Sequence, residues 1–373
     1  MRPHTLRSLT AGRRLLVFVG EGGVGKTSMA AATALAAAVA GRHVAVLTID
    51  PAPRLCDALG IDTIDGRPQS VDLGQRRAQA GGSLVAMRLD TKGTFDAMVE
   101  ELAPDPATAA RLLANPVYQA ISDRLGGSEG YVAFQRLWEL GRRNSYDLIV
   151  VDTPPAANLQ TLMSAPLRLS ALMDSRAAEI LADPTRILMR AGSSLARTTA
   201  AVALGILERV AGAGLRGQVA DFIAGFEPLL NALNSRAAEV NDMLAQGSFV
   251  VVIRLDADTM GLSHTFCREL AEAGMTVTSV VANRVIPGSG QGPGQTSDSL
   301  ADGAPEGTLV AVQKMETGLG RLRSTQTLVM EEMTRRIVGD TTVLTAPAAK
   351  TGIGGLDDLE TLAASLKQAE TAA

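Results

Sequence analysis

Residues 20–28 read Gly-Glu-Gly-Gly-Val-Gly-Lys-Thr-Ser, a glycine-rich run that ends in a lysine and two hydroxyl residues. It follows the apolar run 15–19 and precedes the alanine-rich run 29–40, so the order strand, loop, helix is predicted. Gly20 and Gly25 fit the spacing G-x-x-x-x-G-K-[ST] of a phosphate-binding loop. In such loops the backbone N–H groups and the start of the following helix stabilise phosphates. The stretch therefore predicts nucleotide binding.

The side chains of this loop have separate predicted roles. Lys26 supplies a positive charge to the phosphates, and the hydroxyl of Thr27 is the expected ligand of a magnesium ion. The other residues predicted to bind the nucleotide lie in the same loop: Gly20, Gly22, Gly23, Val24, Gly25 and Ser28. A glycine-rich turn that matches by chance is the alternative, and the strand before and helix after it argue against that alternative. The motif is stronger evidence for binding than for hydrolysis.

Two further predicted strands end in aspartates. The run 43–49 is continuously apolar, as in a buried parallel strand, and leads to Asp50. The run 146–151 leads in the same way to Asp152, the candidate for supporting magnesium. Open α/β sheets bind ligands at the carboxyl ends of their strands, so Asp50 and Asp152 are expected near the phosphate loop. A turn aspartate in Asp-Pro-Ala-Pro and a helix N-cap remain the respective alternatives.

Strands and helices alternate over most of the chain, which predicts an α/β fold: a phosphate-loop, mostly parallel sheet flanked by helices. Further strands are predicted at 84–89, 248–255, 277–284 and 341–345. Helices are predicted at 91–102, 106–125, 131–142, 259–273 and 316–338, with a closing helix from residue 356. Asn283 ends one of these strands, where its amide could bind a purine edge; a turn asparagine is the alternative.

A helical insertion is predicted at 174–246, because this segment contains no strand-like run. It divides the nucleotide-binding core into 1–173 and 247–373, and the Gly-, Ser- and Pro-rich stretch 287–307 is expected to be a mobile loop. The last helix of the insertion has apolar residues at three- and four-residue spacing: Val219, Phe222, Phe226, Leu229, Leu233, Ala237, Val240 and Leu244. Packing within the protein is the favoured interpretation, and a groove for a hydrophobic client is the other.

Composition excludes several classes of protein. A hydrophobic fraction of 46% supports a sizeable core, while only 3% aromatic residues means that aliphatic side chains and alanine must fill it. The net charge of −4 provides no basic surface for nucleic acid. Cys56 and Cys267 are far apart, so neither a disulfide framework nor a zinc site is expected. No signal peptide or spanning apolar run is found, which predicts a cytoplasmic protein.

Together, these motifs resemble the arsenite-pump and guided-entry ATPase family, a deviant Walker A branch of the phosphate-loop proteins whose guided-entry members target tail-anchored proteins. The resemblance is carried by the phosphate loop, by 49–59, 146–155 and 281–284, and by the helical insertion. It implies magnesium-dependent ATP hydrolysis, with Asp50 orienting the attacking water beside Lys26, Asp152 supporting magnesium, and Asn283 holding adenine. It also implies a nucleotide-gated dimer whose insertions can form a groove for hydrophobic membrane-protein segments.

The most consequential departure from that family is Glu21, which replaces the signature lysine that reaches the partner's phosphates across the dimer. A carboxylate cannot stabilise negative charge that develops on phosphate. The hypothesis is a heterodimer with a paralogue that carries the lysine. A homodimer in which Glu21 simply points to solvent is the alternative. Glu21 also favours the alternative to an active ATPase, a non-catalytic subunit that binds nucleotide as a sensor.

Two other departures narrow the function. The paired cysteines of the eukaryotic guided-entry proteins are missing from 287–307, so no zinc is expected, and arsenite transport is disfavoured because the two cysteines are isolated. A membrane-positioning ATPase is a further alternative, although the acidic closing helix makes a poor membrane anchor. The loop at 346–355 only loosely resembles the family's adenine-side loop, and the client and pathway are left open.

Overall fold

A computed structural model provides the structure of the chain. It describes residues 9–79, 81–116, 118–119, 129–142, 145–154, 232, 235–287, 306–336, 341–349 and 352–369. The chain divides into two compact units. The first comprises Met1–Arg88, Asn144–Leu159 and Met243–Ala373, and the second comprises Leu89–Arg143 and Gln160–Asp242. Most of the predicted insertion 174–246 lies outside the described residues, so its boundaries stay a prediction.

The first unit contains a nine-stranded sheet in the order β3-β4-β2-β5-β1-β6-β7-β8-β9 among the described residues. The strands are β1 (Leu15–Gly20), β2 (His43–Thr48), β3 (Gln69–Val71), β4 (Ser83–Arg88), β5 (Leu148–Asp152), β6 (Ser248–Arg254), β7 (Val277–Val285), β8 (Thr342–Pro347) and β9 (Lys367–Gln368). All neighbours pair in parallel except β3 and β9, the two antiparallel edge strands. The predicted phosphate-loop α/β fold is confirmed.

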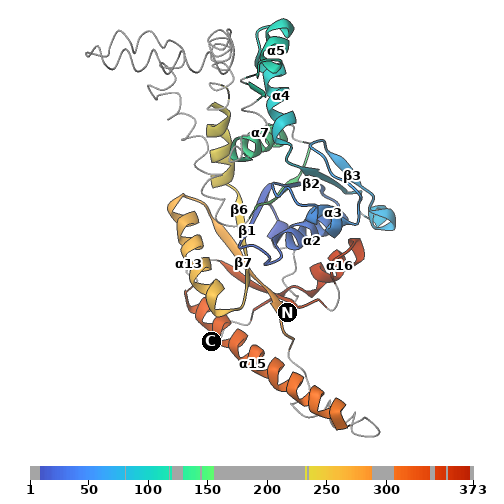
Figure 1. The fold of residues 1–373 in the computed structure, drawn as a ribbon, viewed down its shortest axis with the longest axis vertical. Coiled ribbons are helices and arrows are strands. Elements are labelled where there is room, and N and C mark those ends of the chain that lie inside the picture. Colours follow the sequence, from blue (N-terminus) through green and yellow to red (C-terminus); the bar gives the residue numbers. More distant parts are fainter. Residues whose placement is uncertain are drawn as a thin grey trace, which may run out of the picture. The chain divides into compact units, whose positions relative to one another are not determined.

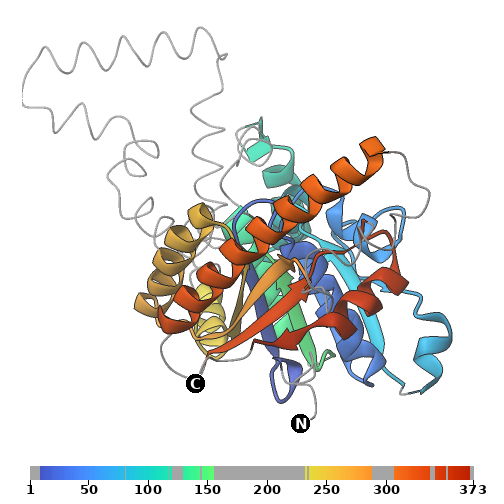
Figure 2. The same cartoon turned by 90° about the horizontal axis from the view of Figure 1, so that it is seen from below.

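The helices of the first unit cover both faces of this sheet. They are α2 (Lys26–Val39), α3 (Arg54–Leu59), α13 (Ala257–Glu272), α15 (Glu306–Arg336) and α16 (Leu356–Ser365), with a short 3₁₀ helix at Gly74–Gln79. Connections from β1 to β2 and from β6 to β7 lead away from β1 in opposite directions. Right-handed crossovers therefore place α2 and α13 on opposite faces, as Figure 1 shows. Helices α3 and α16 pack with α2, and α15 lies beside α13 (Figure 2).

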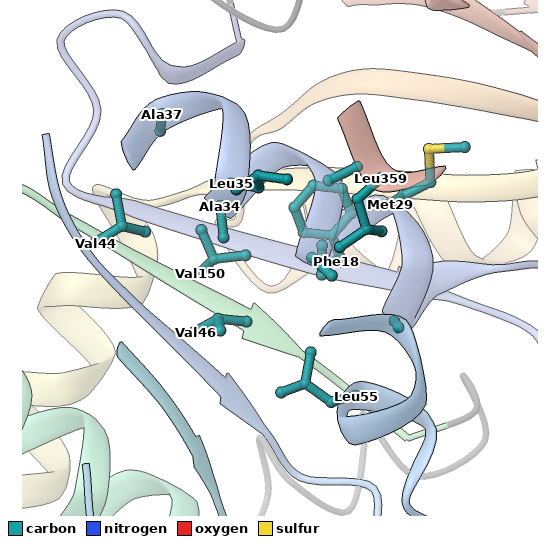
Figure 3. Packing of buried hydrophobic residues seen from close by; sticks show 14 of the residues in the cluster. Phe18, Met29, Ala34, Leu35, Ala37, Val44, Val46, Leu55, Val150 and Leu359 are labelled. Carbon is teal, nitrogen blue, oxygen red and sulfur yellow. The ribbon is translucent and has the colours of Figure 1, made fainter. Parts of the chain in front are cut away.

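Aliphatic side chains and alanine fill the core between the sheet and α2. Phe18 of β1 is 1% exposed and lies among Met29, Leu35 and Leu359 (Figure 3). Many of the residues that α2 buries are alanines, which allow the helix to approach the sheet closely. Both faces of the central strands are covered, which explains why these strands are continuously apolar rather than alternating.

The second unit is helical where the structure describes it. Its helices are α4 (Thr91–Leu102), α5 (Pro106–Leu113), α7 (Glu129–Arg142) and the part of helix 235–245 that precedes Met243. Asp90 and Asp105 cap α4 and α5 by accepting hydrogen bonds from backbone N–H groups. In the last of these helices, Ala237 and Val240 are buried, as their apolar stripe predicts.

Two predicted helices have wrong boundaries. The helix predicted at 106–125 ends at Leu113, because Asn115-Pro116 follows and proline disfavours the helical conformation of the residue before it. The helix predicted from residue 316 begins instead at Glu306. Good helix formers between 308 and 315 outweigh the glycines around them. Much of the predicted loop, 288–305, lies outside the described residues.

No helix in the described ranges combines the length with the apolar composition needed to cross a bilayer. The longest of them, α15, illustrates the point, because lysine, glutamate and arginine interrupt its apolar residues repeatedly.

Gly20 ends β1 at a point where the backbone of the neighbouring strand leaves no room for a side chain. Its φ is +149°, and a Cβ there would lie 2.2 Å from the carbonyl oxygen of Val252 in β6. Gly20→Ala should therefore reduce the free energy of unfolding by more than about 4 kcal/mol, since sheet backbone must move. Urea denaturation measures this loss.

Gly23→Ala is the matched control, because Gly23 has φ +74° and open space around its missing side chain. It should lose only the roughly 1–2 kcal/mol of left-handed backbone strain. Equal stability of Gly20→Ala and Gly23→Ala proteins would show that the approach of Gly20 to Val252 is not as close as described.

Candidate nucleotide-binding site

The sheet order brings the three chemically informative strand ends together. β1 lies beside β5, and β5 lies beside β2, all parallel. Asp152 is in register with Phe18 of β1 and with Thr48 of β2. The phosphate loop and Asp50 follow directly at the same edge. The connections that follow β1 and β6 run toward opposite sides of the sheet. The carboxyl ends of these strands therefore form a topological switch point, where open α/β sheets bind ligands.

A pocket of about 690 Å³ opens at this edge. Its lining joins the phosphate loop to the ends of β2, β7 and β8, and consists of Gly23, Gly25, Lys26, Thr27, Ser28, Asp50, Arg54, Asp57, Ala58, Asn283, Arg284, Pro347, Ala348, Ala349, Gly352, Ile353 and Leu362. A volume of several hundred Å³ is typical of a small-molecule site. Three other predicted loop residues lie elsewhere: Gly20 packs against Val252, Gly22 is exposed and Val24 is buried.

Lys26 is held inside the loop that precedes it. Its side chain is largely buried, and Nζ donates a hydrogen bond of 2.7 Å to the backbone carbonyl oxygen of Glu21. Burial lowers the pKa of Lys26, and the carboxylates of Asp152 and Asp50 partly oppose that shift. The ammonium group is therefore pre-positioned in a loop whose backbone already favours anions.

Thr27, Thr48 and Asp152 form a buried hydrogen-bonded group. The hydroxyls of Thr27 and Thr48 donate to Oδ2 of Asp152 at 2.8 and 2.9 Å. The other carboxylate oxygen, Oδ1, is buried and has no hydrogen-bond partner among the described residues. Desolvation raises the pKa of Asp152 to about 6, although the two threonine hydroxyls act in the opposite direction.

This group fits a magnesium ion. Mg²⁺ takes oxygen ligands, often one or two carboxylates with substrate phosphates and water. Asp152 provides a carboxylate with one unsatisfied buried oxygen, and Thr27 provides a hydroxyl next to it. A cation near them would also compensate the burial of the Asp152 charge. The two residues predicted to hold magnesium are thus adjacent in the structure.

Asp152→Asn should stabilise the ligand-free protein at neutral pH. The pKa of about 6 in the folded state exceeds the ordinary value of 3.8, so stability from protonated Asp152 is present below about pH 4 and is lost as pH rises through 6. The asparagine variant should therefore gain up to about 3 kcal/mol over wild type at pH 8 and nothing at pH 4. Urea denaturation across this range measures the difference.

The same variant should respond less to magnesium. If Asp152 supports the ion, adding Mg²⁺ to the protein with nucleotide raises the melting temperature of wild type further than that of Asp152→Asn. Thr48→Val is the control, because Thr48 bonds to the same carboxylate without being a predicted ligand. A ligand-free Asp152→Asn protein less stable than wild type at pH 8 would contradict the assigned burial cost.

Asp50 is bound by its own neighbours in sequence. Its Oδ1 accepts a hydrogen bond of 3.0 Å from the backbone N–H of Ala52, and its Oδ2 accepts one from Nη1 of Arg54. The first contact is the turn geometry that Asp-Pro-Ala-Pro predicts. Asp50 also lines the pocket with Lys26, so the turn role and the site role coexist.

Asn283 connects β7 to the phosphate loop. Its Nδ2 donates to the carbonyl oxygen of Val24 at 2.8 Å, and its Oδ1 accepts from the backbone N–H of Arg284. A Cβ on Gly25 would lie 2.3 Å from this Nδ2, so the glycine makes the contact possible. Asn283 lines the pocket as expected, but its amide bonds to the loop, and one N–H is left for a base.

Glu21 does not simply point to solvent. The residue is half-buried, and its Oε1 is shielded from solvent without a hydrogen-bond partner in the described part of the chain. Its backbone carbonyl oxygen accepts the hydrogen bond from Nζ of Lys26. Burial lowers the pKa of Lys26 and the charge of this carboxylate raises it, so the missing hydrogen bond at Oε1 is what remains unsatisfied at this position.

Sequence reasoning missed several residues of the site, among them Thr48, Arg54 and Arg284. Thr48 could have been found from its place near the carboxyl end of the second apolar run, beside Asp50. Arg54 follows Asp50 by four residues, the spacing of an ion pair in a turn or helix. Arg284 adopts a left-handed φ of +58°, which no sequence signal for a non-glycine residue reveals.

The family model of the anion-transporting ATPases matches residues 13–298, which include the phosphate loop, Asp50, Asp152 and Asn283. The chain belongs to the anion-transporting ATPase family. The predicted resemblance to arsenite-pump and guided-entry ATPases is thereby confirmed, and this family is a family of ATPases.

Individual relatives of this anion-transporting ATPase family member are distant. Protein SCO2128 of Streptomyces coelicolor is 31% identical over 278 residues, which cover 74% of this chain and 63% of that protein. Protein Rv2184c of Mycobacterium tuberculosis is 34% identical over 41% of this chain and 37% of its own length. ATPase GET3 of Malassezia globosa is 25% identical over 44% of this chain and 46% of its own length. The chain thus spans less than two thirds of each of these relatives.

Proposed function

We propose that this chain is a magnesium-dependent ATPase of the cytoplasm that changes shape with its nucleotide and works as a dimer. The observation that carries the proposal is the single pocket that holds Lys26, Thr27 and Asp50, with Asp152 bonded to Thr27 beneath it. Together, these residues supply a positive charge for the phosphates, ligands for the metal ion and a carboxylate that can orient the attacking water. Family membership supports ATP as the nucleotide.

The roles follow from chemistry and position. Lys26 and the loop N–H groups bind the phosphates, while Thr27 and Asp152 hold the magnesium ion, which neutralises charge on the phosphates when bound. Asp50 orients the attacking water, and Asn283 lies where the base binds. No zinc is expected to take part. The same proposal includes a helical insertion at 174–246, which would provide a surface for a hydrophobic client.

The proposed dimer is heteromeric because of Glu21. This residue brings a carboxylate, with one unsatisfied buried oxygen, to the loop position where the family lysine is expected to reach a partner's phosphates. A paralogue carrying that lysine would complete the site of this chain. Glu21 would leave the paralogue's own site without the corresponding positive charge.

Phosphate release tests this proposal. The chain alone should hydrolyse ATP slowly, and addition of the lysine-bearing paralogue should accelerate it by about 10²-fold or more, the size of one lost transition-state contact. Glu21→Lys should restore part of that rate to the chain alone. Glu21→Gln is the control, since it removes the carboxylate charge without supplying a cation.

The outcomes separate the alternatives. Full turnover by a homodimer of the unaltered chain would end the heteromer proposal. Nucleotide binding without phosphate release, with or without the paralogue and in Glu21→Lys, would instead identify a non-catalytic nucleotide-sensing subunit, which Glu21 also favours.

A membrane-positioning ATPase is less well supported. In the closing helix α16, Asp357 and Glu360 form ion pairs with Arg76 of the same unit, at 3.0 Å for Glu360. An acidic helix face occupied in this way gives no attraction to anionic lipid headgroups. Flotation with liposomes in the presence of ATP should leave the chain in the unbound fraction. Recovery with the liposomes would favour this alternative.

A further inference from the structure

Arg54 forms an ion pair with Asp50, the residue proposed to orient the attacking water. The guanidinium of Arg54 donates through Nη1 to Oδ2 of Asp50, while the N–H of Ala52 holds Oδ1. Both carboxylate oxygens are thus engaged by residues of one short segment. With Arg54 in this position, the carboxylate is partly neutralised and partly covered, which is unfavourable for a group that must accept hydrogen bonds from water.

The ion pair between Arg54 and Asp50 contributes little to the fold. The Arg54 side chain is 60% exposed, against 13% for Asp50, and exposed ion pairs stabilise folded proteins only weakly. Leu55 and Leu59 anchor α3 instead, since both are buried in the core. The position of Arg54 therefore calls for an explanation other than folding.

Arg54 places a positive charge in the part of the pocket lining that contains the phosphate loop. The loop 20–28 contains one cationic side chain, Lys26, which is buried and bonded to the Glu21 carbonyl. Glu21 adds a negative charge to the same loop. Arg54 lines the same pocket as Lys26, and its exposed side chain can change partner without disturbing the core.

We propose that Arg54 senses the terminal phosphate of ATP by exchanging its partner, from the Asp50 carboxylate to phosphate oxygens. The guanidinium fork matches phosphate in a bidentate way, and such charge-assisted contacts are strong. The exchange frees Asp50 for water only when the terminal phosphate is present; with ADP, Arg54 stays on Asp50. This inference rests on the proposed ATPase function and deepens it by naming the residue that distinguishes ATP from ADP.

Calorimetric titration of the full chain with magnesium and either ADP or the non-hydrolysable analogue AMP-PNP tests the exchange without requiring turnover. Arg54→Ala should weaken AMP-PNP binding about tenfold and leave ADP binding within about twofold. Arg335→Ala is the matched control, because Arg335 forms an exposed ion pair with Glu332 on α15, away from the pocket lining. It should leave both affinities unchanged.

A second pair of variants tests the competition between carboxylate and phosphate. Asp50→Asn removes the charge that holds Arg54, so AMP-PNP should bind about threefold more tightly while ADP binding is unchanged. The gain should vanish in the double variant Asp50→Asn/Arg54→Ala, which should match Arg54→Ala. If Arg54→Ala fails to fold, Arg54→Gln retains the length and polarity of the side chain and takes its place.

Three results overturn the inference. Equal loss of ADP and AMP-PNP affinity in Arg54→Ala would show that Arg54 only shapes the pocket, and no loss of either would show that it does not contact nucleotide. A gain in Asp50→Asn that persists without Arg54 would remove the exchange. Failure of the proposed function is a different result: the unaltered chain would then bind neither nucleotide, and the inference would fall with it.

Discussion

Asp50→Asn is expected to abolish ATP turnover without weakening ATP binding. Asp50 lines the phosphate end of the pocket, and its carboxylate is the group assigned to the attacking water. Asparagine retains the size of the side chain and one oxygen, but it lacks the negative charge with which the carboxylate orients the attacking water. Removal of a positioned carboxylate that acts on the attacking water typically reduces the rate by about 10²–10⁴-fold.

Asp57→Asn is the control for this prediction, because Asp57 is a second aspartate of the same pocket lining. It changes the local charge by the same amount without a role assigned in the reaction. Phosphate release should be nearly unchanged in Asp57→Asn and lost in Asp50→Asn, in whichever assembly hydrolyses ATP. Equal turnover in wild type and Asp50→Asn would remove Asp50 from the mechanism.

Lys26→Ala should act on binding itself. The ammonium group is buried in the loop and is fixed on the Glu21 carbonyl, so it meets the phosphates without losing further conformational freedom. Its removal eliminates charge-assisted hydrogen bonds worth about 2–3 kcal/mol, which corresponds to a loss of affinity of about 30- to 150-fold for ATP and ADP alike. Calorimetric titration with either nucleotide measures this loss.

Lys92→Ala provides the comparison for Lys26→Ala. Lys92 is half-exposed and pairs with Asp96 on α4, where no nucleotide site is proposed. Its removal should leave nucleotide affinity unchanged. The two variants thereby separate a site effect from a general loss of positive charge. Retention of wild-type affinity by Lys26→Ala would place the phosphates elsewhere.

The parts of the fold that could be predicted are those with dense local signals. Long apolar strands such as 43–49, and the spacing of the phosphate loop, are visible in sequence because burial on both faces requires uninterrupted apolar residues. The edge strands β3 and β9 have three and two residues and no such pattern. The start of α15 at Glu306 was not predicted, because glycines in this segment disfavour a helix and the surrounding residues overcome that cost.

The candidate site was predictable in its strand ends but not in its contacts. The carboxyl ends of β1, β2 and β5 were expected to meet, and the structure brings them together. The bond between Asn283 and Val24 joins residues separated by 259 positions. It depends on β6 lying next to β1 and β7 next to β6 in the sheet, an order that no local pattern predicts. For the same reason, the unsatisfied oxygens of Asp152 and Glu21 emerge only from packing.

The position of β1 between β5 and β6 has a consequence for biosynthesis. β1 ends at Gly20 and β6 begins only at Ser248, so during synthesis one edge of β1 has no partner until β6 has been made. The Asn283 contact that braces the loop comes later still. The complete pocket therefore forms only after β8 has been made, and until β6 pairs with β1 the nascent chain carries an open, apolar strand edge, which is prone to aggregation.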